Sequence, residues 1–251
     1  MQVGFIGAGN MARALARGWG DPVLCTDSGS GRARALADEL GGEAVASNRE
    51  LAERVDLVIL AHKPAQLAEI AWEAAGTAKA VVSLLARTPQ ADVRAAYPGI
   101  PVFRIEPNTA VALRRGVLAF AEPDTEVDQG LRARVRELFS RVGTVVDVPE
   151  RMMPVAGAIS GVGPAYWALL VEAQVDAAVK AGMPAAMATD LVTGTMTGSA
   201  ELVRAHGGDT LGIRREVASP GGTTAKGLAA LEAGGVRAAF ARAMDEVVGD
   251  G

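Results

Sequence analysis

Small residues near the start of the chain have the types and spacing of a turn that binds phosphate. Gly7, Gly9 and Ala12 form a G-x-G-x-x-A pattern between a short apolar run and an amphipathic helical pattern. The first glycine permits a tight strand-to-helix turn, the second admits a close backbone approach, and the alanine lets helix and strand pack closely. A diphosphate then binds free N–H groups at a helix start, where the helix dipole favours negative charge. The stretch predicts a dinucleotide site that includes Asn10 and Met11.

A second chemically suggestive stretch is SPGGTT at residues 219–224, directly before a predicted helix. Two glycines and a helix N-terminus offer several N–H groups and a positive dipole end, which is enough to bind one carboxylate. The hydroxyls of Ser219, Thr223 and Thr224 add donors and acceptors. Composition alone leaves a plain loop with a helix N-cap as an equal alternative.

The residues after the second predicted strand bear on which dinucleotide binds. Asp27 lies near the position where such folds place an acid on the adenosine ribose, which is typical of NAD. Ser28, Ser30, Arg32 and Arg34 follow at once, and hydroxyls with arginines suit the 2′-phosphate of NADP. A solvated helix face explains the arginines equally well, so the sequence leaves NAD and NADP open.

A third polar turn follows the buried strand predicted over residues 56–60. It reads His62-Lys63-Pro64, and it falls at the carboxyl edge of the sheet, where open α/β folds bind ligands. We expect Lys63 to reach a ribose or phosphate of the cofactor, with an exposed loop lysine as the alternative. We interpret His62 as a polar turn residue rather than a general acid.

The surrounding elements fall into two parts. Strands alternate with helices through residue 148, which predicts a doubly wound (Rossmann) domain over residues 1–149. From Glu150 no further strands alternate with helices and long helices begin at Pro164, which predicts an all-α domain over residues 150–251. Tyr166 to Val179 is apolar on nearly all sides, and such a helix must be buried all round. We therefore expect a second subunit to cover it.

Composition narrows the classes of function. The 251 residues carry a net charge of −4 with scattered basic residues, so a nucleic-acid partner is not expected. One cysteine, Cys25, and two histidines allow no disulfide framework and predict no metal site. No apolar run approaches the roughly 18 residues that span a bilayer. We expect no membrane partner and a cytoplasmic location.

Several motifs in order resemble the pyrroline-5-carboxylate reductase family over nearly the whole chain. They are VGFIGAGNMA at the start, HKP at 62–64, PNT at 107–109, ISGVGPAYW with a following EA at 159–173, AGMP at 181–184, and VASPGGTTAKGLAALEAGGVRAAF at 217–240. The SPGGTT and SGxGPAY elements are specific to this family, whereas the glycine-rich turn is not.

The resemblance implies a dinucleotide-binding domain followed by a helical dimerisation domain, and reduction of 1-pyrroline-5-carboxylate to L-proline with NAD or NADP. It implies interlocked homodimers whose substrate site lies between the cofactor domain of one chain and the helices around SPGGTT; dimers of some members form decamers. Position by position, Thr224 matches the catalytic threonine that hydrogen-bonds the substrate's ring nitrogen. The matched carboxylate cradle is Ser219, Gly221, Gly222 and Thr223, and the matched cofactor-lining positions are Asn48, Lys63, Ala86 and Asn108, with Pro64 beside them.

Some residues depart from the family pattern, and they leave alternatives open. Arg87 stands where the family usually has glycine, Glu106 and Ala110 flank PNT unusually, and Lys226 replaces an apolar or small residue. A reductase of a different cyclic imino acid and a non-catalytic nucleotide-binding paralogue are the alternatives. A β-hydroxyacid dehydrogenase is disfavoured, because the helix after residues 161–163 has no lysine until Lys180.

Overall fold

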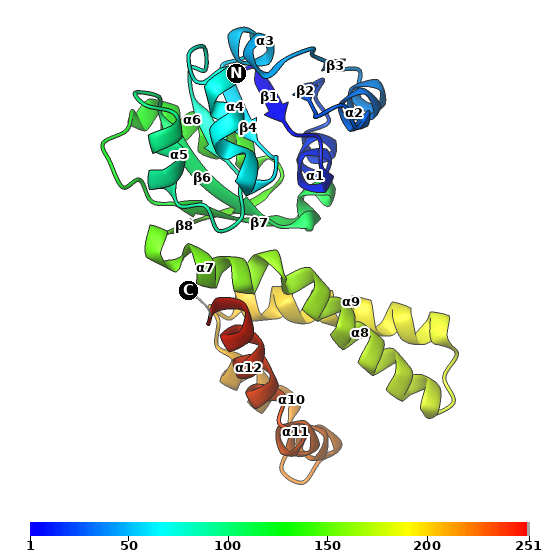
Figure 1. Cartoon of the computed structure of the whole chain (residues 1–251). Helices are drawn as coiled ribbons and strands as arrows, with labels where there is room; N and C mark the ends of the chain where they lie inside the picture. The colour runs from blue at the N-terminus through cyan, green and yellow to red at the C-terminus, as the bar shows by residue number, and fades with distance from the viewer. Residues whose placement is uncertain (250–251) are drawn as a thin grey trace. The chain divides into compact units, whose positions relative to one another are not determined.

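The structure, a computed structural model, describes residues 1–249. The chain forms two compact units, Met1–Pro164 and a second that begins at Ala165 (Figure 1). The first unit holds the sheet, and the second is entirely helical over its described residues. An α/β unit followed by an all-α one confirms the fold class predicted from the sequence.

The first unit is built on one eight-stranded sheet of order β3-β2-β1-β4-β5-β6-β7-β8. Its strands pair in parallel except for β6 and β7, which pair antiparallel. Alternation of strands and helices predicted the parallel part but not the antiparallel pair. β6 and β7 are joined by residues 108–115, too few for the crossover that parallel strands require. The strands are β1 Val3–Ile6, β2 Leu24–Thr26, β3 Glu43–Ala44, β4 Leu57–Leu60, β5 Val81–Ser83, β6 Val102–Pro107, β7 Gly116–Ala121 and β8 Gly143–Val148.

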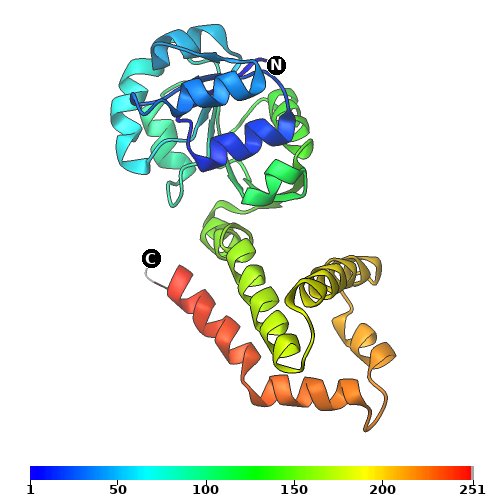
Figure 2. The ribbon, with the colours of Figure 1, turned by 90° about the vertical axis from the view of Figure 1, so that its right-hand side faces the viewer.

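Helices cover both faces of this sheet (Figure 2). On one face α1, α2 and α6 pack against alternate strand residues such as Phe5 and Ile59, and on the other α3, α4 and α5 pack against Ile6 and Val58. All of β4 is fully buried, as expected for a parallel strand covered on both sides. The helices are α1 Asn10–Trp19, α2 Arg32–Leu40, α3 Asn48–Arg54, α4 Leu67–Ala74, α5 Gln90–Ala96 and α6 Gln129–Ser140, with short 3-10 turns η1 Pro64–Gln66 and η2 Thr109–Leu113.

The chain after β8 is helical earlier than predicted. The turn η3 Glu150–Met152, helix α7 Met153–Ala156 and the π-helical turn η4 Gly157–Gly161 lead into α8 Gly163–Lys180. The sequence predicted a helix only from Pro164, because the glycines of this stretch hide its periodicity. Met153 and Ala156 pack on β7, so this segment belongs to the first unit.

The second unit buries little of its own apolar surface. Its helices after α8 are α9 Ala185–Ala205, α10 Thr210–Val217, α11 Thr223–Ala233 and α12 Val236–Val248. Among its described residues Ala188 alone is fully buried. Large side chains remain exposed, including Trp167 at 56%, Leu169 at 62% and Leu231 at 60%. So much exposed apolar surface marks an interaction face.

The same exposure bears on the membrane prediction. Glu150–Lys180 is long and apolar enough to cross a bilayer by length and composition, which the search of the sequence for unbroken apolar runs did not reveal. Only 11% of its most apolar window is buried within the chain. An exposed apolar helix face of this kind is equally suited to packing against a second subunit.

A buried arginine ties β6 to the start of the helical segment. The Arg104 side chain is 4% exposed and donates to the carboxylates of Glu106 and, at 2.8 Å, Glu150. Glu150 also accepts from the backbone and side chain of Gln90. Glu106, unusual for the family at this position, therefore has a structural partner in Arg104.

Removing this arginine leaves two partly buried carboxylates without their cation. We expect Arg104→Met to lower the free energy of unfolding by about 3 kcal/mol, because breaking a buried pair leaves an uncompensated charge. Urea unfolding followed by circular dichroism measures the change. The control is Arg34→Met: Arg34 and Asp38 are 78% and 64% exposed, so we expect a loss below about 1 kcal/mol. Equal losses in the two variants would contradict this account of Arg104.

Candidate functional site

The first glycine of the predicted turn is required by the fold itself. Gly7 has φ of +99° and donates its N–H to the Thr26 carbonyl at 3.1 Å. A Cβ at this position would lie 2.7 Å from the backbone of Ala61 and His62. The left-handed φ and the close approach both exclude a side chain. Gly7 thereby lets β1 and β4 lie side by side at the carboxyl edge of the sheet.

The second glycine has no such structural reason. Gly9 is the N-cap of α1 with φ of −76°, and a Cβ there would come no closer than 3.9 Å to the Ala61 carbonyl oxygen. No side chain caps the start of α1, so its first N–H groups remain available. Space in front of a helix N-terminus that a Cβ would enter fits a bound diphosphate.

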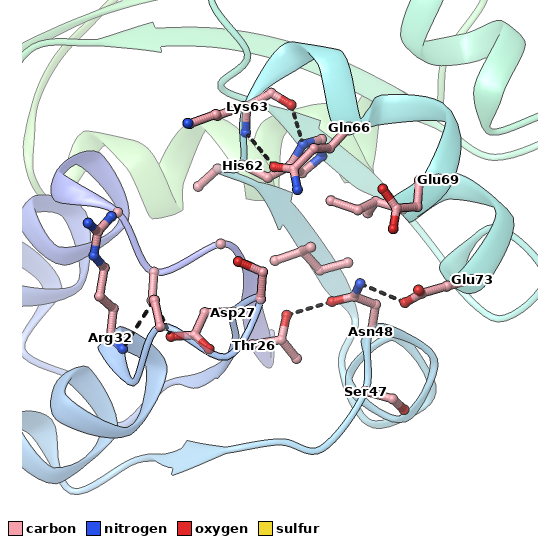
Figure 3. Close-up of a pocket in the computed structure, with 18 of the residues that line it drawn as sticks. Thr26, Asp27, Arg32, Ser47, Asn48, His62, Lys63, Gln66, Glu69 and Glu73 are labelled. Carbon is pink, nitrogen blue, oxygen red and sulfur yellow. Dashed lines mark hydrogen bonds between the residues drawn. The ribbon is translucent and has the colours of Figure 1, made fainter.

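A cavity of about 810 Å³ opens at this turn (Figure 3). β1 pairs with β2 on one side and with β4 on the other, so the chain order reverses here, and open α/β sheets bind ligands at such a point. The volume lies within the range of about 300–1,000 Å³ for ligand sites. Of the residues predicted to bind cofactor, those lining the cavity are Gly7, Gly9, Asp27, Ser28, Asn48 and Lys63.

The other predicted cofactor residues lie outside the cavity lining. Ala12 is fully buried in the core, and Asn10 and Met11 form the first turn of α1. Pro64 begins η1, and Ala86 is exposed after β5.

Asn108 and Arg87 also lie beyond this cavity. Asn108 is 8% exposed, and its side-chain oxygen accepts from the Val117 N–H at 3.2 Å. Arg87 has φ of +54°, a left-handed conformation that favours glycine, the residue expected here from the family resemblance.

The histidine at the cavity has the properties of a turn residue. His62 Nδ1 lies 2.9 Å from the Lys63 carbonyl, which only accepts, so we assign the ring proton to Nδ1. Burial lowers the pKa of His62, which keeps the ring neutral at pH 7. His62 lines the cavity, and its Nε2 is buried without a hydrogen-bond partner among the described residues. A neutral imidazole does not supply a general acid.

One wall of the cavity was not predicted from the sequence. Helix α4 contributes Glu69, Trp72 and Glu73, and Trp72 is 84% exposed. Glu73 accepts from the Asn48 side-chain amide at 2.8 Å, and Thr26 donates to the Asn48 oxygen at 2.6 Å (Figure 3). Nothing in the spacing of the α4 residues indicated this wall, because the exposure of Trp72 is known only from the structure.

The SPGGTT stretch forms a turn at the start of α11. Gly221 has φ of +71°, and the Gly222 N–H donates to the Ser219 carbonyl at 3.0 Å. Gly222 is the N-cap and no side chain caps the helix, so the N–H groups of its first turn are available. Thr223 and Thr224 are exposed. The turn thus leaves N–H groups and hydroxyls exposed at a helix N-terminus.

Fold and cavity together define a dinucleotide-binding protein of the doubly wound class with an appended helical unit. Residues 2–87 match the family model described as NADP oxidoreductase, coenzyme F420-dependent. Residues 150–250 match the model described as pyrroline-5-carboxylate reductase dimerisation.

Relatives that match this chain over nearly their whole length identify the family. A pyrroline-5-carboxylate reductase of Synechocystis is 34% identical over 97% of this chain and 94% of its own length. The solved structure of the Streptococcus pyogenes 1-pyrroline-5-carboxylate reductase has a TM-score of 0.88 at 30% identity, covering 99% of this chain and 96% of that one. The Plasmodium falciparum enzyme, solved with NADP bound, has 0.87 at 25% identity over 99% and 95%. The chain belongs to the pyrroline-5-carboxylate reductase family.

Substituting each glycine of the turn in a separate variant distinguishes an effect on folding from an effect on dinucleotide binding. We expect Gly9→Ala to keep the melting temperature and to weaken dinucleotide binding about tenfold or more, because the new methyl group enters the diphosphate space. We expect Gly7→Ala to lower the melting temperature, because its methyl group meets the Ala61 backbone. Differential scanning fluorimetry and titration calorimetry measure the two effects. A Gly9→Ala protein that binds as tightly as the original would remove this turn from the site.

Proposed function

We propose that the protein reduces 1-pyrroline-5-carboxylate to L-proline with NADH or NADPH. The observation that carries the proposal is the cavity at the β1–β4 crevice, bounded by a glycine turn whose second glycine has no packing role. This cavity lies in a chain that belongs throughout to the pyrroline-5-carboxylate reductase family. The same relatives support proline biosynthesis as its role, and we place it in the cytoplasm.

The reaction requires little acid–base catalysis by the protein. When bound, NAD(P)H supplies the hydride that reduces the substrate C=N carbon. A cyclic imine takes its proton readily from water, so the neutral His62 beside the cavity is no obstacle. The chain's contribution is to hold the imine in one orientation and to exclude others.

The turn before α11 is the proposed substrate seat. N–H groups around Gly221 and Gly222 and the N-terminal dipole of α11 bind the carboxylate, with Ser219 and Thr223 as further donors. The Thr224 hydroxyl hydrogen-bonds the ring nitrogen and sets its position. These roles follow from the family resemblance and from the free N–H groups of this turn.

A homodimer completes the proposed site. Exposed apolar side chains on α8, α9 and α11 need a cover, and the family model that matches this region is a dimerisation domain. In the proposed dimer the cofactor domain of one chain meets the SPGGTT turn of its partner, and further assembly to a decamer leaves that pairing unchanged. This arrangement also gives the apolar helix at Glu150–Lys180 a protein environment in place of a membrane.

Two alternatives share the fold. A reductase of another cyclic imino acid would oxidise the cofactor with a different ring size, and a nucleotide-binding paralogue would bind it without turnover. Cofactor oxidation with 1-pyrroline-5-carboxylate and with its six-membered homologue, measured separately with NADH and NADPH, distinguishes all three. Turnover confined to the six-membered ring, or binding with no turnover, would contradict the proposal.

Removing one hydroxyl tests the substrate seat. We expect Thr224→Ala to lose ~10–100-fold in kcat/KM, because one oriented hydrogen bond is worth ~1.5–3 kcal/mol. Steady-state kinetics measure the loss. The control is Thr210→Ala, at the exposed first residue of α10 in the same unit, which we expect to retain full activity. Unchanged kinetics in Thr224→Ala would exclude Thr224 from the site.

A further inference from the structure

The loop after β2 carries a fixed negative charge inside the cofactor cavity. Asp27 follows the last residue of β2 and lines the same cavity as Gly7 and Gly9 (Figure 3). Its side-chain oxygens accept from the Gly29 N–H at 2.9 Å, the Ser30 hydroxyl at 2.8 Å and the Ala33 N–H at 2.9 Å.

These hydrogen bonds fix both the position and the charge of the carboxylate. Partial burial raises the pKa of Asp27, but the bonds from Ala33, Ser30 and Gly29 outweigh it and hold the pKa below its ordinary value. The group is therefore ionised throughout the physiological range. Three donors leave further acceptor capacity on the two oxygens, which is what a ribose hydroxyl requires.

The same bonds occupy the donors that a 2′-phosphate would need. The Ala33 N–H belongs to the first turn of α2, where an anion would otherwise bind, and Asp27 already accepts from it. The Ser30 hydroxyl proton is also directed at Asp27. The Asp27 carboxylate therefore already occupies the N–H and hydroxyl donors that a bound 2′-phosphate would use.

The arginines that suggested NADP are not gathered around that seat. Arg34 donates to Asp38 at 3.0 and 3.1 Å, is 78% exposed and does not line the cavity. Arg32 lines the cavity and is exposed. Because a guanidinium can stack on an aromatic ring with or without a phosphate nearby, Arg32 alone does not indicate NADP.

We propose that Asp27 makes this protein select NAD(H) over NADP(H), by accepting the adenosine ribose 2′-hydroxyl and repelling a 2′-phosphate. The inference rests on the proposed function for its cofactor class, and it deepens that proposal by naming the residue that sets the preference. The family model and the Plasmodium falciparum structure both carry NADP in their descriptions, so the proposal distinguishes this chain from them.

The test uses fragments that carry no nicotinamide, so its readout is independent of catalysis. Titration calorimetry of the full-length protein with ADP-ribose and with 2′-phospho-ADP-ribose, at one ionic strength, gives two dissociation constants. We expect ADP-ribose to bind at least about tenfold more tightly, because a phosphate beside a fixed carboxylate is repelled. Equal binding, or tighter binding of the phosphorylated fragment, would overturn the proposal without any variant.

Variants then assign the preference to the residue. We expect Asp27→Asn to reduce the ratio of the two constants about tenfold or more, and the matched charge removal Asp38→Asn, on α2 but outside the cavity lining, to leave it unchanged. An unchanged ratio in Asp27→Asn, or an equal change in Asp38→Asn, would overturn the role of Asp27. Arg32→Ala should weaken both fragments alike; a loss confined to the phosphorylated one would also overturn it.

These outcomes are separable from failure of the proposed function. A protein that prefers ADP-ribose but turns over no cyclic imine keeps this inference and loses the proposed reaction. A protein that reduces 1-pyrroline-5-carboxylate but binds both fragments equally keeps the reaction and loses this inference.

Discussion

The hydrophobic effect on the helical unit is the constraint on which the account depends. Helices α8 to α12 expose large apolar side chains that a single chain does not bury, and Ala188 is the lone fully buried residue among the described residues of that unit. At roughly 25 cal/mol per Å² of apolar surface, covering such faces strongly favours association. A second copy is the partner that the dimerisation match supports. The exposed apolar faces of the helical unit therefore indicate that it associates with a further copy of the chain.

The sheet unit, by contrast, is complete within one chain. Both faces of the sheet carry a buried core, and at the crevice between β1 and β4 the Gly7 backbone lies directly against the backbone of Ala61 and His62. Gly7 serves the fold and Gly9 leaves room for a ligand. Cofactor binding is thus a property of the single chain, whereas the proposed reaction needs two. In the proposed mechanism the cofactor and the substrate carboxylate accordingly bind to different units.

Local sequence signals predicted what depends on local chemistry. The glycine turn and the helices of the second unit were readable from the sequence, as is the N-cap of α3, where the Ser47 hydroxyl accepts from the Glu50 N–H. Cys25 is fully buried in β2, and burial raises the pKa of its thiol to about 11. Cavity lining depends on which helices meet, so the wall formed by α4 and its Trp72 stayed hidden.

Some unusual residues gained a physical account only from packing. Glu106 pairs with the buried Arg104, and Arg87 adopts the left-handed backbone that a glycine would take. Neither partner nor backbone angle can be read from spacing along the chain. For Ala110 and Lys226 the structure offers no explanation. None of these departures alters the glycine turn or the loop before α11.

Subunit complementation tests the central claim that the active site is shared between two chains. One variant, Gly9→Leu, fills the diphosphate space, and another, Thr224→Leu, blocks the anion seat; each homodimer should be inactive. Co-expression with different affinity tags isolates the mixed dimer, in which one site then has both intact halves. The account predicts about half of the wild-type activity per mixed dimer. A mixed dimer as inactive as its parents would show that each chain carries its own complete site, and would contradict the account.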